Sequence, residues 1–200
     1  MDGSVSHEQT TQIVDICSID LGFAWMLRKL GESEVTDVTE WGAAVQKHHD
    51  AQSVRRMYVR LFISYVESVL ATIRGEILEE FDHFSAAERA ALTEITYDIT
   101  DQGKPTEKAL PVSLLKGLRF TFWMYAEVYG LDASPDYGGE GWRAFQDAVR
   151  IRNRITHPKQ VASLAISDME VARVDEAYRW FHEAYVFLIE AFVSKFSKLR

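Results

Sequence analysis

Apolar residues recur every three or four positions along most of the chain, which is the spacing of a helix with one buried face. The pattern is most regular from Ser53 to Phe81 and predicts one amphipathic helix of about eight turns. Its apolar positions are Val54, Met57, Tyr58, Leu61, Phe62, Tyr65, Val69, Leu70, Ile73, Ile77 and Leu78. No sustained two-residue alternation of the strand type is evident, so the pattern predicts an all-α chain.

Two capping-box signatures bound further helices, because each places a serine three residues before a glutamate. Ser85–Glu88 predicts a short helix that continues toward Thr96. Ser167–Glu170 predicts a long helix that runs nearly to Arg200.

Three more segments complete the predicted bundle. The apolar and aromatic stretch 110–130 predicts the most buried helix, and a loop at 101–105 precedes it. A helix from 141 to about 156 is stopped by the following proline. One or two helices are expected near 12–30 and 38–48. These elements predict an all-α helical bundle.

Composition indicates an ordinary globular protein rather than a disordered or membrane-spanning one. The chain has 200 residues, of which 47% are hydrophobic and 26% charged, and it can bury one core, with or without a small appendage. The lone Cys17 cannot form an internal disulfide. Residues 1–11 lack the basic and apolar regions of a secretory signal, and no apolar window reaches spanning length. We therefore expect a cytoplasmic protein without membrane contact.

Charge is unevenly distributed. The net charge of −8 disfavours a general nucleic-acid coat protein, because such proteins neutralise phosphates with basic side chains. The segment 143–159 nevertheless carries five basic residues and one acidic residue, a local excess of 5 − 1 = +4. This distribution favours a confined phosphate site on an acidic body.

The segment Arg152-Asn153-Arg154-Ile-Thr-His157-Pro158 combines the groups that phosphodiester cleavage needs. Arginine binds phosphate through two parallel N–H donors, and histidine gains or loses a proton near neutral pH. At about 100° per residue, Ala144, Ala148, Ile151 and Ile155 form one apolar stripe that should face the core. Arg143, Gln146, Arg150, Asn153 and His157 lie on the opposite side.

These residues resemble the signature of the HEPN superfamily, R-x4–6-H, in which a polar residue, commonly asparagine, follows the arginine. Arg152, Asn153 and His157 match it at the end of a helix in an all-α chain. The resemblance implies a four-helix core at 51–200. Residues 1–50 have no counterpart in it and, from their own pattern, form an additional N-terminal helical extension. It also implies a homodimeric, metal-independent endoribonuclease without a cofactor, acting as a toxin or in phage defence, with a possible antitoxin or defence partner.

The resemblance also implies residue roles. His157 would act as general acid or base, Arg152 would stabilise charge on the phosphoryl oxygens, and Asn153 would orient His157 or the phosphate. Arg150 also fits the spacing, so the identity of the catalytic arginine stays open. Lys159 stands where one subgroup has a tyrosine that a partner adenylylates, so that route of silencing is not expected.

Other basic and acidic residues are assigned supporting roles. Arg150, Arg154 and Lys159 add positive charge beside the motif. On the long helix, Glu67 is placed to hold the catalytic arginine and Arg60 to touch RNA. The competing interpretation of Arg56, Arg60, Glu67 and Arg74 is a solvated charge stripe, and it is the preferred one.

The motif also has a non-catalytic interpretation, in which His157 caps the helix and the arginines are ordinary surface residues. The chain would then be a helical module that binds a protein partner, or an accessory protein that binds a nucleotide or tRNA. The pair His48-His49 lacks a metal-ligand spacing, so no metal site is expected. Trp123, Tyr125 and Tyr129 are expected to pack in the core rather than to stack on bases.

Overall fold

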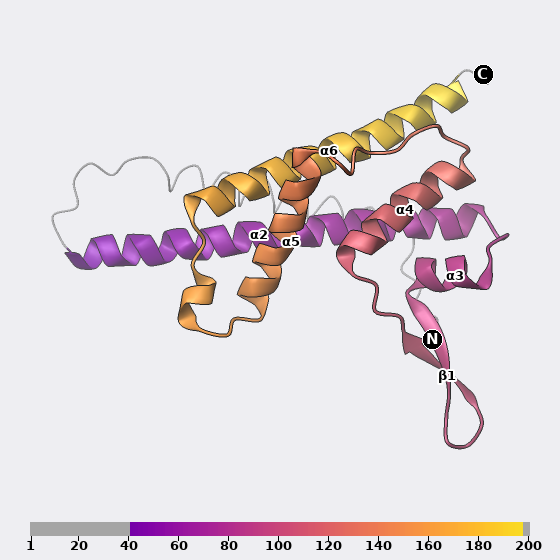
Figure 1. The fold of residues 1–200 in the computed structure, drawn as a ribbon, viewed down its shortest axis with the longest axis horizontal. Coiled ribbons are helices and arrows are strands. Elements are labelled where there is room, and N and C mark those ends of the chain that lie inside the picture. Colours follow the sequence, from indigo (N-terminus) through magenta and orange to yellow (C-terminus); the bar gives the residue numbers. More distant parts are fainter. Residues whose placement is uncertain (1–40, 198–200) are drawn as a thin grey trace. The chain divides into compact units, whose positions relative to one another are not determined.

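The computed structural model describes residues 41–197, and their side chains from residue 51 onward. Its elements, in order, are α2 (Trp41–Glu80), α3 (Ala86–Thr93), β1 (Ile95–Ile99), β2 (Pro105–Ala109), α4 (Leu114–Val128), α5 (Glu140–Thr156), the 3-10 turn η1 (Val161–Leu164) and α6 (Asp168–Phe196) (Figure 1). The mainly helical class is confirmed. The helix predicted at 12–30, and the side chains of 1–50, lie outside the described residues.

The long helix α2 joins two predicted helices into one. It begins at Trp41, so the segments predicted at 38–48 and 53–81 are continuous. The predicted apolar positions are buried or half-buried except Met57, which is 37% exposed. Val59, Ile63 and Val66 are buried as well, so α2 is buried over a broader arc than a single stripe.

Both predicted capping boxes form. Ser85 Oγ accepts a bond from the backbone of Glu88, whose carboxylate accepts one from the Ser85 backbone. Ser167 and Glu170 make the same reciprocal pair at the start of α6. Helix α3 stops at Thr93, short of Thr96, because the next residue takes a left-handed conformation with φ 53°.

The prediction of an all-α chain is wrong for residues 95–109, which form an antiparallel hairpin with Ile95 opposite Ala109 and Ile99 opposite Pro105. The predicted loop is its turn, in which Gly103 has a φ of +72° and donates to the Thr100 carbonyl. The alternation of Ile95, Tyr97 and Ile99 with polar residues is a strand signal, but it is only five residues long.

The described residues divide into two compact units, and α2 and α6 each contribute to both. Unit 1 contains residues 69–135 and 186–197. Its core includes edge-to-face contacts of Tyr129 with Phe81 and Phe192, and Lys195 Nζ donates to the Tyr129 carbonyl at 2.8 Å. Helix α4 buries Tyr125 as predicted, but Trp123 is 51% exposed, so the expectation that it packs in the core is wrong.

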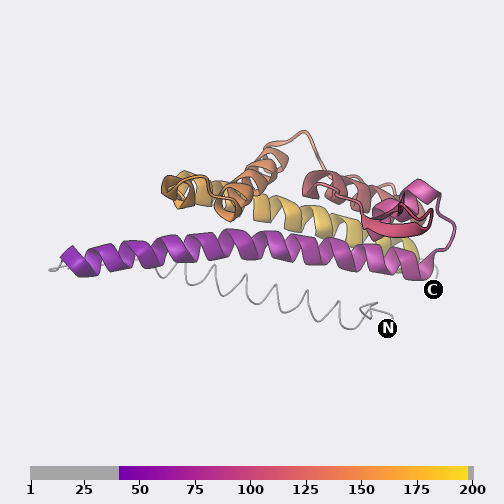
Figure 2. The same ribbon diagram turned by 90° about the horizontal axis from the view of Figure 1, so that it is seen from below.

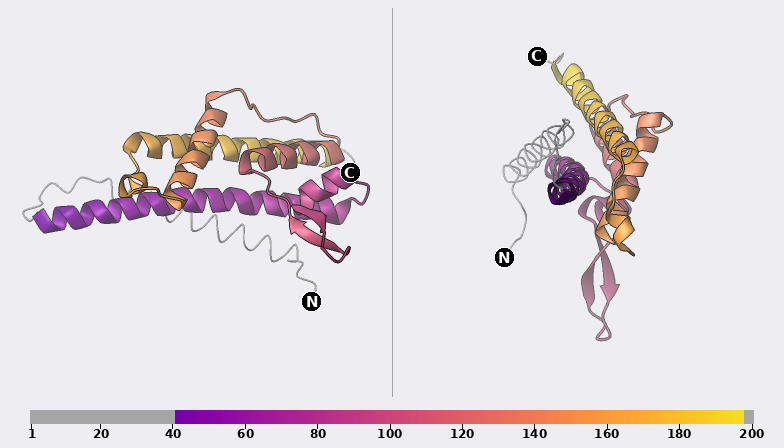
Figure 3. Two further views of the ribbon diagram at one scale, coloured as in Figure 1. Left: turned by 60° about the horizontal axis from the view of Figure 1, so that its bottom comes forward. Right: turned by 90° about the vertical axis from the view of Figure 1, so that its left-hand side faces the viewer.

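Among the described residues, unit 2 contains 41–68 and 136–185, and it holds the motif helix α5. In this unit α5 and the first part of α6 lie on the same side of α2 (Figures 2 and 3). The predicted stripe of α5 is buried, with every member at most 6% exposed: Ala144, Ala148, Ile151 and Ile155. Phe145 packs edge-to-face on Phe62 of α2 and stacks with Phe181 of α6.

Among residues 41–197, no helix is both long enough and apolar enough to cross a bilayer.

Substitution of Gly141 should test the packing at the start of α5. A Cβ at Gly141 would lie 2.6 Å from Trp180 Cδ1, and Trp180 is held by its Nε1 bond to the Asp136 carbonyl at 3.1 Å. We expect Gly141→Ala to lower the free energy of unfolding by about 1–3 kcal/mol through overpacking. Gly75→Ala is the control, because its Cβ would meet nothing within 4 Å. It should raise stability by up to about 1 kcal/mol in urea unfolding. Equal losses for both variants would contradict the packing described.

Candidate functional site

The C-terminal end of α5 exposes the motif histidine. The helix ends at Thr156, and His157 caps it with φ −122° and ψ 64° while its N–H donates to the Asn153 carbonyl at 3.0 Å. Proline at 158 causes this, because its ring disfavours the α conformation of the preceding residue. The His157 side chain is exposed, and no group of residues 51–197 hydrogen-bonds to its imidazole. Asn153 and Lys159 are exposed as well.

Arg152 is held by a residue from another helix. Its Nη2 lies 2.5 Å from Glu67 Oε1 on α2, and the side chains are 25% and 51% exposed respectively. A guanidinium has five N–H donors, so this bond leaves donors with which Arg152 can bind an anion. The sequence suggested Glu67 as the holder of the motif arginine, and the structure brings the two side chains together.

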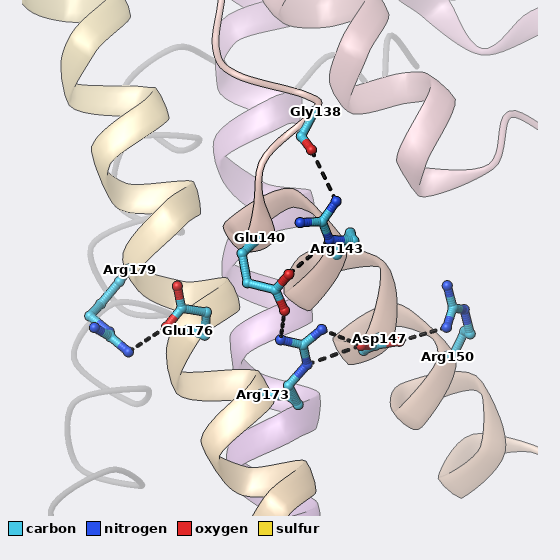
Figure 4. Close-up of polar contacts among 8 residues, drawn as sticks. All are labelled: Gly138, Glu140, Arg143, Asp147, Arg150, Arg173, Glu176 and Arg179. Carbon is cyan, nitrogen blue, oxygen red and sulfur yellow. Dashed lines mark hydrogen bonds and ion pairs between the residues drawn. The ribbon is translucent and has the colours of Figure 1, made fainter.

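Arg150 is instead paired along its own helix. Its Nη1 lies 2.5 Å from Asp147 Oδ1, and its side chain is 70% exposed. Asp147 also accepts two bonds from Arg173 of α6, at 2.9 and 3.0 Å, which fixes the carboxylate (Figure 4). Arg150 is thereby drawn toward the preceding turn, whereas Arg152 reaches across to α2. Both arginines remain candidates for the phosphate contact.

The Arg173 network changes the acidity of its members. Arg173 also binds Glu140, which in turn accepts a bond from Arg143 Nε at 2.8 Å (Figure 4). The hydrogen bond from Arg173 lowers the pKa of Glu140 below its ordinary value, and the bond from Arg143 adds to this. The hydrogen bond to Glu140 raises the pKa of Arg173, and the hydrogen bond to Asp147 adds a smaller effect in the same direction. These residues join the first turns of α5 to α6.

Arg154 has a structural role. Its Nη1 donates to the carbonyls of Ser163 and Ala165 at 2.9 and 2.8 Å, and its Nη2 pairs with Glu170 at 2.6 Å. The guanidinium therefore ties the end of α5 to the turn η1 and to the capping box of α6. The suggestion that Arg154 adds free positive charge for RNA is not supported by this geometry.

Side chains of α2 also bind the backbone of this turn and of the residues that follow it. Arg56 donates to the Leu164 carbonyl at 3.2 Å, and Arg55 donates to the Ile166 carbonyl at 2.9 Å. Gln52 exchanges two bonds with the Ile166 backbone. The turn that follows the motif is thus fixed by side chains more than 100 residues earlier in the chain.

Arg60 and Arg74 of α2 each contact another element of their own unit, and Arg60 is also exposed to solvent as the charge-stripe interpretation expects. Arg60 Nη2 donates to the Ile155 carbonyl in the last turn of α5 at 3.1 Å. Arg74 pairs with Glu94 at 2.7 Å. With Arg56 and Glu67, these side chains reach across to other parts of their own units instead of pointing only to solvent.

Sequence reasoning missed Asp147 and Arg173 as partners, and also Gln52 and Arg55. Asp147 and Arg173 are 26 residues apart and belong to different helices. No local spacing rule relates such positions. The sequence indicated only that Asp147 and Arg173 are charged residues on amphipathic helices, without indicating that they meet.

An open cavity of about 200 Å³ lies in unit 1, and none of the predicted site residues lines it. Four carboxylates contribute to its lining, those of Glu80, Asp82, Glu88 and Glu127. Its negative charge disfavours a polyanionic ligand. Within residues 51–197, no group of three or more histidine, cysteine or carboxylate side chains is arranged to hold a metal ion.

Comparison of the chain with protein-family models, with curated proteins and with solved structures finds no match.

Loss of Arg173 should shift the titration of Glu140. Arg173→Gln removes the main cause of the lowered pKa, so the Glu140 midpoint should rise toward its ordinary value in a carboxyl NMR titration. The network favours the ionised carboxylate, so it stabilises the fold above the unfolded-state pKa of Glu140. That contribution is lost as pH falls through the lower folded-state pKa. Arg179→Gln is the control, because Arg179 pairs only with Glu176 in this group (Figure 4). An unchanged midpoint in Arg173→Gln would contradict the network.

Removal of Arg154 should destabilise the fold more than removal of Arg150. Arg154→Ala removes the donor of the Ser163 and Ala165 carbonyls and of Glu170 Oε1, whereas Glu170 Oε2 keeps its bond from Ser167. We expect a loss of about 1–3 kcal/mol in the free energy of unfolding. Arg150→Ala breaks one exposed pair and should change it by no more than about 0.5 kcal/mol. Chemical unfolding of both variants measures the difference. Equal values would show that the Arg154 contacts add little.

Proposed function

We propose that this chain is an HEPN-like, metal-independent endoribonuclease with its active residues at the C-terminal end of α5. The observation that supports the proposal most is the exposed imidazole of His157 at the end of the same helix that carries a partly exposed Arg152, which Glu67 holds in place. A proton carrier and a positioned cation are the two groups that cleavage of a phosphodiester requires.

The proposed reaction uses the 2′-hydroxyl of RNA as the nucleophile. His157 accepts the hydroxyl proton while the 2′-oxygen forms a bond to the adjacent phosphorus. The bond from phosphorus to the 5′-oxygen breaks, and that oxygen takes up a proton from water, which leaves a 2′,3′-cyclic phosphate and a 5′-hydroxyl. Arg152 neutralises the charge that grows on the non-bridging oxygens, and Asn153 orients the phosphate or the imidazole. DNA lacks the nucleophile and should be inert.

Glu67 is a positioning residue in this scheme. A long arginine side chain loses rotamer freedom when it is placed for catalysis, and a fixed carboxylate limits that cost. Glu67 sits on α2, whose neighbouring residues Phe62 and Val66 are buried. The carboxylate is therefore attached to a firmly packed part of the unit.

A second copy of the chain completes the proposed site. Arg152 and His157 are five residues apart, so on a regular helix they point about 140° away from each other. A regular helix does not aim both groups at the same phosphate, and His157 departs from that geometry only as the non-helical cap of α5. In a homodimer, the arginine of one copy and the histidine of the other meet at one RNA linkage. A toxin or phage-defence role, with a partner that restrains cleavage, fits such an enzyme.

The alternative function is a non-catalytic module that binds a partner protein. It is favoured by the engagement of the basic residues, since Arg150 pairs with Asp147, Arg152 with Glu67 and Arg154 with Glu170. The net charge of −8 also disfavours broad contact with RNA.

Incubation of the purified chain with single-stranded RNA in EDTA separates the two functions. The enzyme should release 2′,3′-cyclic phosphate ends, and His157→Ala should reduce the rate about 10²–10⁴-fold. Arg152→Ala should act in the same direction. Glu67→Gln should lower kcat with little change in KM, because it loosens Arg152 without removing a group that contacts RNA.

Matched controls make this result specific. Arg179→Ala removes an exposed arginine that pairs with Glu176, outside the motif, and should leave the rate unchanged. DNA of the same sequence, and RNA methylated at the 2′-oxygen, should stay intact. Uncleaved RNA at high protein concentration, or cleavage that survives His157→Ala, would reject the proposed enzyme and leave the partner-binding module.

A further inference from the structure

The β1–β2 hairpin of unit 1 has two strand edges, neither of which pairs with another strand of residues 41–197. It extends from the end of α3, with its turn at the far tip (Figures 1 and 3). All five residues of β2 are exposed, and Tyr97 and Ile99 of β1 are 70% and 66% exposed. A two-stranded hairpin with so little burial is marginally stable in water and gains from a third strand.

The backbone bonds identify the groups that face away from β2. The Thr100 N–H donates to the Lys104 carbonyl at 2.9 Å, and the Leu110 N–H donates to the Glu94 carbonyl at 2.7 Å. Bonded and non-bonded pairs alternate in an antiparallel ladder, so the even-numbered residues of β1 face β2. The N–H and C=O groups of Ile95, Tyr97 and Ile99 therefore point to the open edge.

The two edges differ in their readiness to accept a strand. The outer edge of β2 begins with Pro105, which has no N–H, and continues with the charged Glu107 and Lys108, features that prevent strand addition. The outer edge of β1 has no proline and is formed by Ile95, Tyr97 and Ile99, which favour strands. Only β1 offers an uninterrupted edge.

The charge of β1 indicates which partner it accepts. Its single charged residue, Asp98, is already paired with Lys108 at 3.4 Å on the opposite face of the hairpin. The edge therefore offers neither a basic nor an acidic peptide a complementary charge. An uncharged, β-branched and aromatic strand fits it best, and β1 is itself such a strand.

We propose that β1 pairs with β1 of a second copy of this chain, antiparallel and with Tyr97 on the two-fold axis. Tyr97 then faces Tyr97 of the second copy, and Ile95 faces Ile99 of the second copy. All outward N–H and C=O groups of the three residues find partners. Asp98 lies opposite Thr96, so no like charges meet.

This pairing requires one small rearrangement. The Ile99 N–H now donates to Asp98 Oδ1 at 2.8 Å, and that exposed bond must open. The interface is small, which places the association in the weak class, with a dissociation constant in the micromolar to millimolar range. The proposal stands on the hairpin alone and does not depend on ribonuclease activity.

Two proline substitutions at opposed positions test it. Tyr97 and Glu107 face each other in the register, and both point their N–H groups outward. Tyr97→Pro removes a donor from the β1 edge, and Glu107→Pro removes one from the β2 edge, with no loss from the ladder between the strands. The average mass of the full chain is measured by sedimentation from micromolar to several hundred micromolar, with circular dichroism to check folding.

Wild type and Glu107→Pro should gain mass with concentration relative to Tyr97→Pro. The gain approaches twofold if Tyr97→Pro is a monomer, and exceeds it if Tyr97→Pro is a dimer through α5, because each dimer then carries two β1 edges. Ile99→Lys, which adds a charge to the edge, should behave like Tyr97→Pro and serves if that variant misfolds. Equal masses of wild type and both β1 variants at every concentration would overturn the proposal. So would equal loss of association in Glu107→Pro. Monomeric wild type with slow amide exchange at 95, 97 and 99 would show that another segment of the same chain covers the edge.

Discussion

The packing of α5 on α2 is the constraint on which the candidate site depends. Phe62 meets Phe145 edge-to-face, and Ala144 and Ala148 are fully buried, so α5 has one rotational setting within unit 2. That setting brings Arg152 to Glu67 and the Ile155 carbonyl to Arg60. Because the apolar stripe fixes the rotation of the helix, the polar side chains have little freedom to choose other partners.

Many guanidinium donors near the motif are used in hydrogen bonds to backbone carbonyls. Arginines from α2 and α5 donate to four successive carbonyls of the segment 163–166, with Ser163 and Ala165 bound by Arg154. A short turn after a proline has few backbone partners of its own, and an unsatisfied carbonyl is costly where the residue is buried, as Ile166 is. Positive charge in a sequence thus indicates anion binding only where the structure leaves guanidinium donors available. Arg152 meets that condition better than Arg154 does.

The two proposals use different parts of the chain and different physical effects. The ribonuclease proposal relies on an imidazole that a proline stop exposes and on a cation that α2 positions. The pairing of β1 relies on backbone groups that a hairpin leaves open at one edge. Both involve a second copy of the chain, and each is tested by variants that leave the other's residues untouched.

The sequence by itself determined the helical segments, both capping boxes, the buried stripe of α5 and its proline stop, because helical periodicity and capping are local. It offered Glu67 as a holder of an arginine only as the less favoured alternative to a solvated charge stripe. It did not reveal the hairpin, whose five-residue strands give a weak alternation, or the exposure of Trp123. Only the tertiary structure decided which arginines bind carbonyls and which carboxylates they meet. Those partners are brought together by packing of helices distant in the chain, and no rule of sequence spacing describes that packing.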